Sequence, residues 1–265
     1  MPNEKVYFSI DLNHLTASIG GAILSTVDDV AYGLQLISSS EVKSLELPDS
    51  RLQLLWPEGH KYDINDVKSR FTSSVLGNGL VDFLESFNFI LDDIRKICSI
   101  YSLGKAPTLK GSDIEKLLEK DSNFIRWTTS RKLIWLKDTY GFSVPRDVYE
   151  CILSIDSARN CLVHRKGKVS LDEDVKPSGR VDSLLIKWLR YGFYDKDKNF
   201  FSIGDILQGG VKYNEGFKEV SKEFKVNEVI NFTAEEFAEI GLTLMKFGSH
   251  LVEAINKYGI DKGAI

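Results

Sequence analysis

The sequence predicts a mainly α-helical protein built as a helical bundle, and two observations support this prediction. Apolar residues recur at three- and four-residue spacings over long stretches near both ends of the chain, which is the period of a helix with one buried face. The region from about residue 168 to residue 231 loses this period and is rich in turn residues. We therefore expect a single α-helical domain over residues 1–265, with long N-terminal helices and an irregular insertion before the final helix.

Two long helices are predicted in the N-terminal half. The first keeps its apolar period from Leu12 to Ile37, and the second runs from about Asp63 or Asp66 to Tyr101. Residues 41–61 between them contain prolines and glycine and predict a loop. Gly77, Asn78 and Gly79 place three poor helix formers in a row, so we expect a kink or a break within the second helix.

Shorter helices are predicted before the insertion. A helix start at residues 112–115 introduces a short helix, and another helix runs from Thr128 to Tyr140, where Gly141 stops it. The next helix opens at Pro145 and ends near Gly167.

The final helix has a clear N-terminal signal. Thr233 and Glu236 are spaced as a capping box, and apolar residues follow at helical spacing as far as Ile255. This helix is long enough to return to the core of the bundle.

The insertion at about 168–231 has few apolar residues and many turn residues, so we do not expect it to form a domain of its own. Residues 184–189 fit either a short helix or a strand, residues 195–199 fit the tip of a β-hairpin, and residues 224–232 suggest a short extended segment.

Composition and charge limit the class of protein. Hydrophobic residues make up 43% of the chain and charged residues 27%, as in a soluble globular protein. Three cysteines without metal-ligand spacing suit a reducing cytoplasm, and neither a signal peptide nor a run of 18 apolar residues is apparent. We expect a cytoplasmic protein that does not bind membranes. The net charge of −4 means that any site for RNA has to be local.

The most informative polar residues lie at the end of the helix that opens at Pro145. Arg159 and Asn160 interrupt its apolar stripe, and His164 follows just before Gly167. Asn160 and His164 are four residues apart and share a helical face. Arg159 and His164 are five apart and point about 140° apart on an ideal helix, so a joint site needs the long arginine side chain to swing around.

The run Arg159-Asn160-Cys161-Leu162-Val163-His164, with Gly167 nearby, resembles the HEPN superfamily. Members of this superfamily carry an arginine, a polar residue, a short spacer and a histidine at the end of a bundle helix. The resemblance implies an HEPN-like bundle and a metal-independent endoribonuclease without a cofactor, of the toxin or anti-phage defence kind. It also implies a homodimer that acts on RNA, with an antitoxin or another defence-system protein as a candidate partner.

The chemistry of RNA cleavage suits these residue types. A histidine can transfer protons near neutral pH, and an arginine can hold phosphate oxygens with two parallel hydrogen bonds. We expect His164 and Arg159 to be catalytic, Asn160 to orient the imidazole or the substrate, and Asp156 to position the arginine. One histidine cannot easily make both proton transfers, which agrees with a dimer. The cations expected to bind the RNA backbone are Arg165, Lys166 and Lys168.

Two other interpretations remain open. Arg159 could be a surface charge that pairs with Asp156, with His164 as an ordinary helix-end cation. The chain could also be an HEPN-fold module that dimerises, or binds nucleic acid or a protein, without cutting. The acidic net charge favours such a module, whereas the intact Arg-Asn and His favour the nuclease. No metal site is predicted, because the other histidines have no partner at ligand spacing.

Overall fold

The computed structural model describes residues 10–40, 63–104, 122–175, 182–207, 209 and 211–265. Helices dominate these residues, and a small antiparallel sheet accompanies them, so the predicted mainly α-helical class is confirmed. The predicted loop at 41–61 and the predicted helix start at 112–115 lie outside the described residues. None of the described helices is long and apolar enough to cross a membrane.

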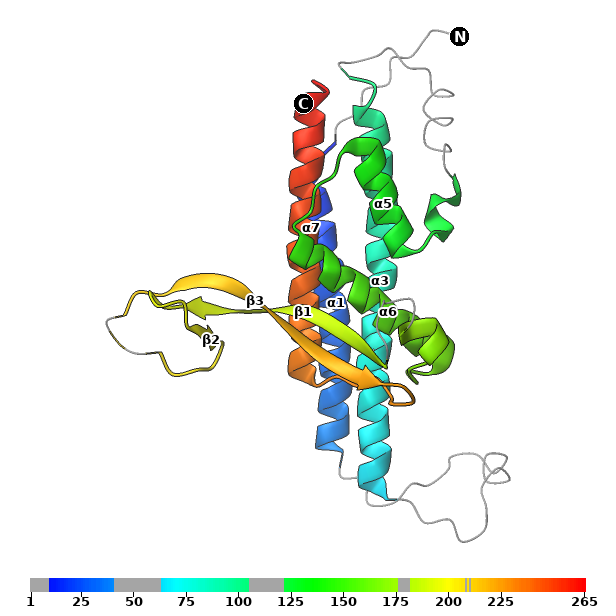
Figure 1. Cartoon of the computed structure of the whole chain (residues 1–265), viewed down its shortest axis with the longest axis vertical. Coiled ribbons are helices and arrows are strands. Elements are labelled where there is room, and N and C mark those ends of the chain that lie inside the picture. The colour runs from blue at the N-terminus through cyan, green and yellow to red at the C-terminus, as the bar shows by residue number, and fades with distance from the viewer. Residues whose placement is uncertain (1–9, 41–62, 105–121, 176–181, 208, 210) are drawn as a thin grey trace.

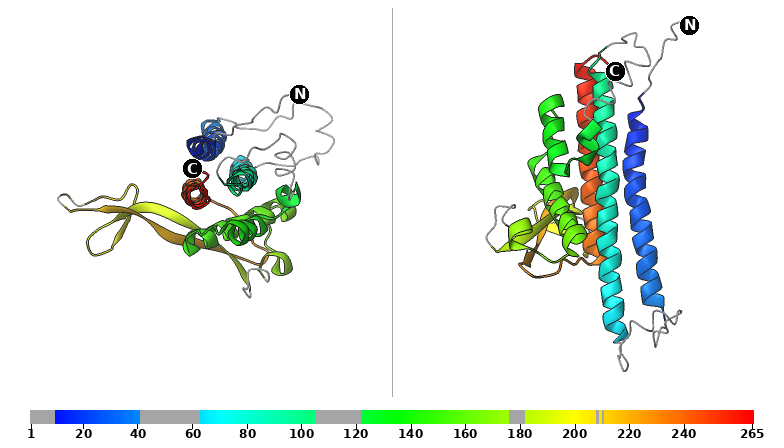
Figure 2. Two further views of the ribbon diagram at one scale, coloured as in Figure 1. Left: turned by 90° about the horizontal axis from the view of Figure 1, so that it is seen from above. Right: turned by 90° about the vertical axis from the view of Figure 1, so that its right-hand side faces the viewer.

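Three long helices form the centre of the molecule. They are α1 (Leu12–Ser39), α3 (Ile64–Tyr101) and α7 (Ala234–Asp261), and they run side by side as a bundle (Figure 1; Figure 2). Each of the three helices packs its apolar face against the other two, as the spacing of its apolar residues predicted. The capping box of α7 is present, since Thr233 and Glu236 exchange backbone-to-side-chain hydrogen bonds of 2.8 and 3.1 Å. The predicted long helices are therefore confirmed.

The predicted break at residues 77–79 is wrong, because α3 runs through it without interruption. Gly79 is buried where α3 meets both neighbours. A Cβ atom there would lie 2.5 Å from Cγ2 of Val30 and 2.8 Å from Cζ of Phe237, well inside van der Waals contact. The glycine thus serves the close approach of α1, α3 and α7, and their packing holds it in a helical conformation despite its low propensity.

A second layer packs against this bundle. It contains the short helix η1 (Ser122–Arg126), α5 (Thr129–Tyr140) and α6 (Arg146–Arg165). Helix α5 starts at the Thr128 cap and ends at Gly141, whose φ of 73° is left-handed, as predicted. Helix α6 follows Pro145 and lies across α3 and α7 (Figure 1).

The region expected to be irregular forms a regular sheet. Strands β1 (Ser183–Tyr194), β2 (Phe200–Ser202) and β3 (Asn214–Lys225) pair antiparallel in the order β2-β1-β3, after a single helical turn η2 (Leu171–Val175). The predicted hairpin tip at 195–199 is confirmed, because it joins the paired residues Tyr194 and Phe200. Residues 184–189, which fitted either a helix or a strand, belong to the strand β1, so the insertion contains a β-hairpin and more regular structure than expected.

The sheet belongs to the same core as the helices. In β1, Leu184, Ile186 and Trp188 alternate inward and are buried. The hydroxyl of Ser154 in α6 bonds to both backbone groups of Lys187, at 2.8 and 3.1 Å. Further bonds join β1 to α7: Leu189 N donates to Thr243 Oγ1 and Trp188 Nε1 donates to Glu239 Oε2. Burial against α6 and α7 therefore selects a strand here. Beyond this contact the far end of the sheet projects away from the bundle (Figure 1).

Candidate functional site

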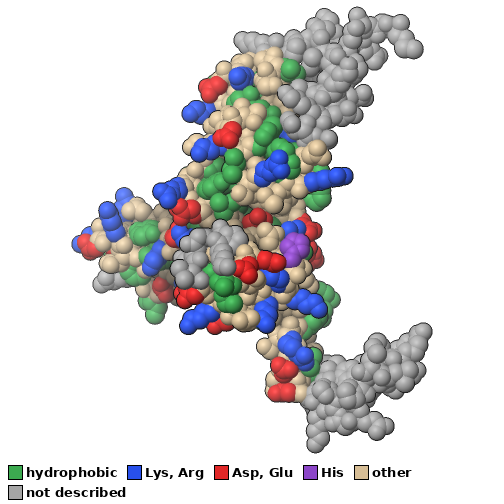
Figure 3. Space-filling view, turned by 45° about the vertical axis from the view of Figure 1, so that its right-hand side comes forward, with side chains coloured by type: hydrophobic (Ala, Val, Ile, Leu, Met, Phe, Trp, Pro, Cys, Tyr) green, Lys and Arg blue, Asp and Glu red, His purple; other side chains and the backbone are tan. Residues whose placement is uncertain are grey.

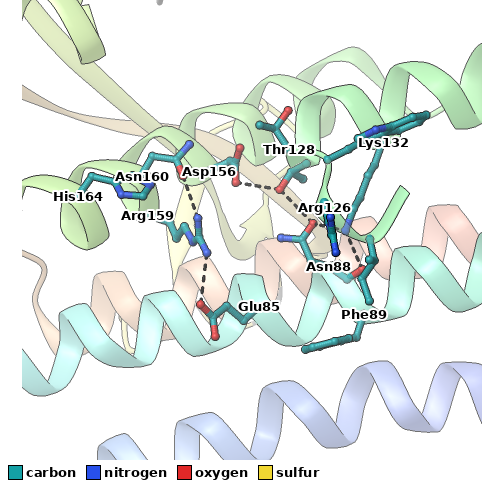
Figure 4. A pocket seen from close by; sticks show the side chains of 13 residues that line it. Glu85, Asn88, Phe89, Arg126, Thr128, Lys132, Asp156, Arg159, Asn160 and His164 are labelled. Carbon is teal, nitrogen blue, oxygen red and sulfur yellow. Dashed lines mark hydrogen bonds and ion pairs between the residues drawn. The ribbon is translucent and has the colours of Figure 1, made fainter. Parts of the chain in front are cut away.

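A pocket of about 340 Å³ lies where α3, η1, α5 and α6 meet, and it contains the residues of the predicted motif. Helix α6 supplies one wall and α3 supplies the opposite one (Figure 4). The residues that line the pocket are Glu85, Asn88, Phe89, Ile125, Arg126, Trp127, Thr128, Thr129, Lys132, Asp156, Arg159, Asn160 and His164.

The end of α6 presents the motif to this pocket. The helix ends at Arg165, and Lys166 and Gly167 follow in left-handed conformations with φ of 54° and 79°. Gly167 N donates to Cys161 O at 3.0 Å and closes the helix end. Arg159, Asn160 and His164 all line the pocket, and His164 is exposed to solvent. The five-residue offset of the arginine and the histidine therefore does not separate them.

Arg159 is held by two neighbours. Its Nη1 donates to Oδ1 of Asn160 at 3.0 Å, and its Nη2 lies 3.3 Å from Oε1 of Glu85 on α3 (Figure 4). Its Nε is buried and has no hydrogen-bond partner among the described residues. An unpaired buried donor is uncommon in proteins, and an anionic ligand at this point would satisfy it.

Asp156 has a different partner from the one expected. It is buried, and its Oδ1 accepts a hydrogen bond of 2.8 Å from Thr129 Oγ1, while Glu85 and Asn160 hold the arginine. Burial raises the pKa of the Asp156 carboxyl, and the Thr129 hydrogen bond and the charge of Arg159 oppose that shift. Asp156 therefore fixes α6 to α5 at the floor of the pocket, and its pairing with Arg159 is not a hydrogen bond.

Lys132 of α5 is a second buried ionisable group at this floor. Its side chain has no solvent exposure, and Nζ donates to the backbone oxygen and to Oδ1 of Asn88 at 3.2 and 3.1 Å. Burial lowers the pKa of the Lys132 ammonium, although the carboxylates of Asp92 and Asp156 raise it. Hydrogen bonds between α3, α5 and α6 thus define the shape of the pocket.

The sequence analysis assigned four of the thirteen lining residues to the site and missed the other nine, of which three bear on the binding of a ligand. Arg126 of η1 is exposed, and beside it Ile125 is 47% exposed; on α3, Phe89 is 62% exposed. A signal for Phe89 existed: it falls on the polar face of its helix, four residues from both Glu85 and Asp93. A signal for Arg126 was its position between aromatic residues.

The pocket is not lined by the cations that were expected to bind RNA, which are Arg165, Lys166 and Lys168. Arg165 donates from Nη1 to Glu173 at 2.6 Å and from Nε to Asp174 at 3.0 Å, with a further bond from Nη2 to Asp174. Its guanidinium therefore fixes the η2 turn against the end of α6, and its expected role in RNA binding stays a prediction. Lys166 and Lys168 are exposed but stand outside the pocket.

The pocket is locally cationic on an acidic protein. Its lining holds the three cations Arg126, Lys132 and Arg159 against the two carboxylates Glu85 and Asp156, whereas the whole chain carries −4. Charges of both signs are mixed over the face in view in Figure 3, and no broad basic surface appears there. The excess of positive charge is therefore local to this pocket.

Other chemistry is not assembled among the residues that the structure describes. Burial raises the pKa of the Cys151 thiol to about 12 and that of Cys161 to about 11, so both are protonated at neutral pH and poor nucleophiles. No group of three or more His, Cys, Asp or Glu side chains in the described ranges is arranged to hold a metal ion.

Comparison of this chain with models of protein families, with curated proteins and with solved structures found no match.

Proposed function

We propose that this protein is a metal-independent endoribonuclease of the HEPN type, acting as a toxin or an anti-phage defence effector. The observation that supports the proposal is the shared pocket of Arg159, Asn160 and His164, which is open to solvent and includes the further cation Arg126. Three residues of α6 and one of η1 thus gather a proton-transfer group and phosphate-binding groups around one pocket.

The proposed reaction is a transesterification within RNA. The oxygen of a 2′-hydroxyl attacks the neighbouring phosphorus, the bond from phosphorus to the 5′-oxygen breaks, and a 2′,3′-cyclic phosphate remains. One group takes the proton of the 2′-hydroxyl and another gives a proton to the leaving 5′-oxygen. Arg159 stabilises the charge that builds up on the phosphate through its guanidinium.

His164 provides one of these proton transfers. Its imidazole is exposed at the pocket, so a substrate can reach it. A second copy of the chain, with its own His164, provides the other transfer, and we therefore propose that the active form is a homodimer in which two such pockets face each other. An antitoxin or another defence protein would then control access to this shared site.

Substitution in α6 tests the nuclease. The unmodified protein should cleave RNA in the presence of a chelator and should not cleave DNA. His164→Ala and Arg159→Ala should each lower the rate of RNA cleavage by about two or more orders of magnitude. Arg159→Lys should also fail, because the lysine loses the bidentate fork. Arg146→Ala is a matched control on the same helix: Arg146 is exposed, and among the described residues its ion pair is with Glu150. Full cleavage by the Arg159 and His164 variants would refute the nuclease.

A binding module of the same fold is the second candidate, and one observation favours it. Oε1 of Glu85 already forms an ion pair with Nη2 of Arg159 at 3.3 Å, so a carboxylate competes with a phosphate for the guanidinium in the free protein. Such a module would bind RNA or a protein partner through the pocket without cutting. Tight binding of RNA by the unmodified protein, with no cleavage product and no effect of His164→Ala, would identify it.

A further inference from the structure

Phe89 is an aromatic side chain on the solvent-facing side of α3, a helix that also buries two phenylalanines in the core. It is 62% exposed, whereas Phe83 and Phe87 on the same helix are 1% and 2% exposed. Its ring has no aromatic or cationic partner among the residues that the structure describes. Exposing so large an apolar surface is unfavourable, which makes the position of this ring at a pocket informative.

The ring lies at the opposite end of the pocket from the histidine. Figure 4 shows Phe89 and Arg126 at one end and His164, Asn160 and Arg159 toward the other. The pocket therefore has an apolar, aromatic end and a polar, proton-transferring end. Trp127 also lines it, but its indole is already covered by the Arg131 guanidinium at 4.2 Å, so Phe89 offers the open aromatic face.

We propose that Phe89 is a base-binding residue, on which the base of an unpaired nucleotide stacks while Arg159 and Arg126 hold its phosphate. The inference rests on the proposed function, because it names the part of an RNA that the pocket takes. Single-stranded nucleic acids are commonly bound in this way, with bases on aromatic rings and phosphates on cations. Bases within a duplex are stacked on each other, so the substrate is a single-stranded segment or a loop.

The size and charge of the pocket agree with this ligand. A volume of about 340 Å³ is at the lower end of the range for small-ligand pockets and suits one nucleotide. Ile125, which is 47% exposed, lines the pocket next to Arg126 and adds apolar surface for a base. The buried, unpaired Nε of Arg159 is a donor that a phosphate oxygen would satisfy.

Equilibrium binding tests the inference separately from catalysis. The probe is a fluorescent ten-nucleotide single strand with 2′-O-methyl riboses, which lacks the attacking hydroxyl and cannot be cut by the proposed reaction. Phe89→Ala should weaken its binding by about tenfold or more, the effect of removing one base–aromatic stack. Phe89→Tyr keeps the ring and should bind as the unmodified protein does. Phe71→Ala is the matched control, since Phe71 is 57% exposed on the same helix and does not line the pocket.

A second probe separates stacking from a general loss of affinity. An abasic strand of the same length and charge should bind equally to the unmodified protein and to Phe89→Ala. An equal loss for both strands, unchanged binding of the base-bearing strand by Phe89→Ala, or no binding of that strand by the unmodified protein would each overturn the inference. If His164→Ala still cuts RNA while Phe89→Ala loses the base-dependent affinity, the nuclease proposal fails and the base site stands.

Discussion

Replacing Gly79 by alanine gives a direct test of how the three long helices pack. The new Cβ atom would lie 2.5 Å from Val30 Cγ2 and 2.8 Å from Phe237 Cζ. Phe237 cannot easily yield, because its ring stacks on Phe83 with centroids 4.6 Å apart. Overpacking of this kind costs about 1–3 kcal/mol, and the better helix propensity of alanine returns about 1 kcal/mol. We expect Gly79→Ala to lower the free energy of unfolding by up to about 2 kcal/mol.

Gly21→Ala is the matched control for that change. Gly21 lies within α1, is exposed, and has no atom within 4 Å of the position of an added Cβ. The free energy of unfolding of the Gly21→Ala variant should rise by the full difference in helix propensity between glycine and alanine, about 0.5–1 kcal/mol. Urea unfolding followed by circular dichroism should thus move the two variants in opposite directions, with unchanged slopes. If Gly79→Ala stabilises the protein as much as Gly21→Ala, the three helices do not approach each other as closely as described.

Four more measurements address the site. Burial raises the pKa of Asp156 in the folded protein above its value in the unfolded chain, so the protein loses stability as the pH rises from the unfolded pKa to the folded pKa. Asp156→Asn removes the buried charge and should raise the melting temperature at pH 7. A gain that persists below about pH 4, where the carboxyl is protonated in both states, would contradict burial of the charge as the cause. Glu85→Gln removes a carboxylate that competes for Arg159, so binding of a single-stranded oligonucleotide should strengthen while stability changes by less than about 1 kcal/mol; weaker binding would show that Glu85 has to orient the arginine. Arg165→Ala leaves the buried Asp174 without its charged partner, with only the hydrogen bond from Ser170 N, and should cost about 2 kcal/mol or more. Lost RNA affinity at unchanged stability would instead identify Arg165 as an RNA ligand. Sedimentation should give twice 29.9 kDa, and a monomer that cuts RNA would remove the need for a second copy.

The sequence was sufficient where a structural signal is local. The apolar stripes of α1, α3 and α7 follow the helical period, and the Thr233 capping box and Gly141 mark helix ends by their own hydrogen bonding and backbone angles. The clustering of Arg159, Asn160 and His164 in one pocket was also expected, because a single helix end presents all three. Their reaction and the family resemblance stay predictions.

The sequence was insufficient where a partner distant in the chain decides. Residues 184–189 fit a helix or a strand, and the contacts of β1 with Ser154 and Thr243 select the strand. Low propensity at Gly79 suggested a kink or a break, but α3 is continuous there, and only a glycine fits between Val30 and Phe237. Arg126 comes to the pocket from a segment more than thirty residues before the histidine, a proximity that no spacing in the sequence encodes.

The buried charges at the floor of the pocket connect the two ends of the site. Lys132 and Asp156 are both buried, and each is bonded to neutral groups, Lys132 to Asn88 and Asp156 to Thr129. Apolar side chains of similar volume would fill this space at a smaller desolvation cost, so packing alone does not explain the two charged side chains. Their bonds tie α5 to α3 beside Phe89 and to α6 one turn before Arg159. The aromatic and the polar ends of the pocket are therefore held at a fixed separation by one hydrogen-bonded floor, which is the preorganisation that binding one nucleotide in a defined pose requires.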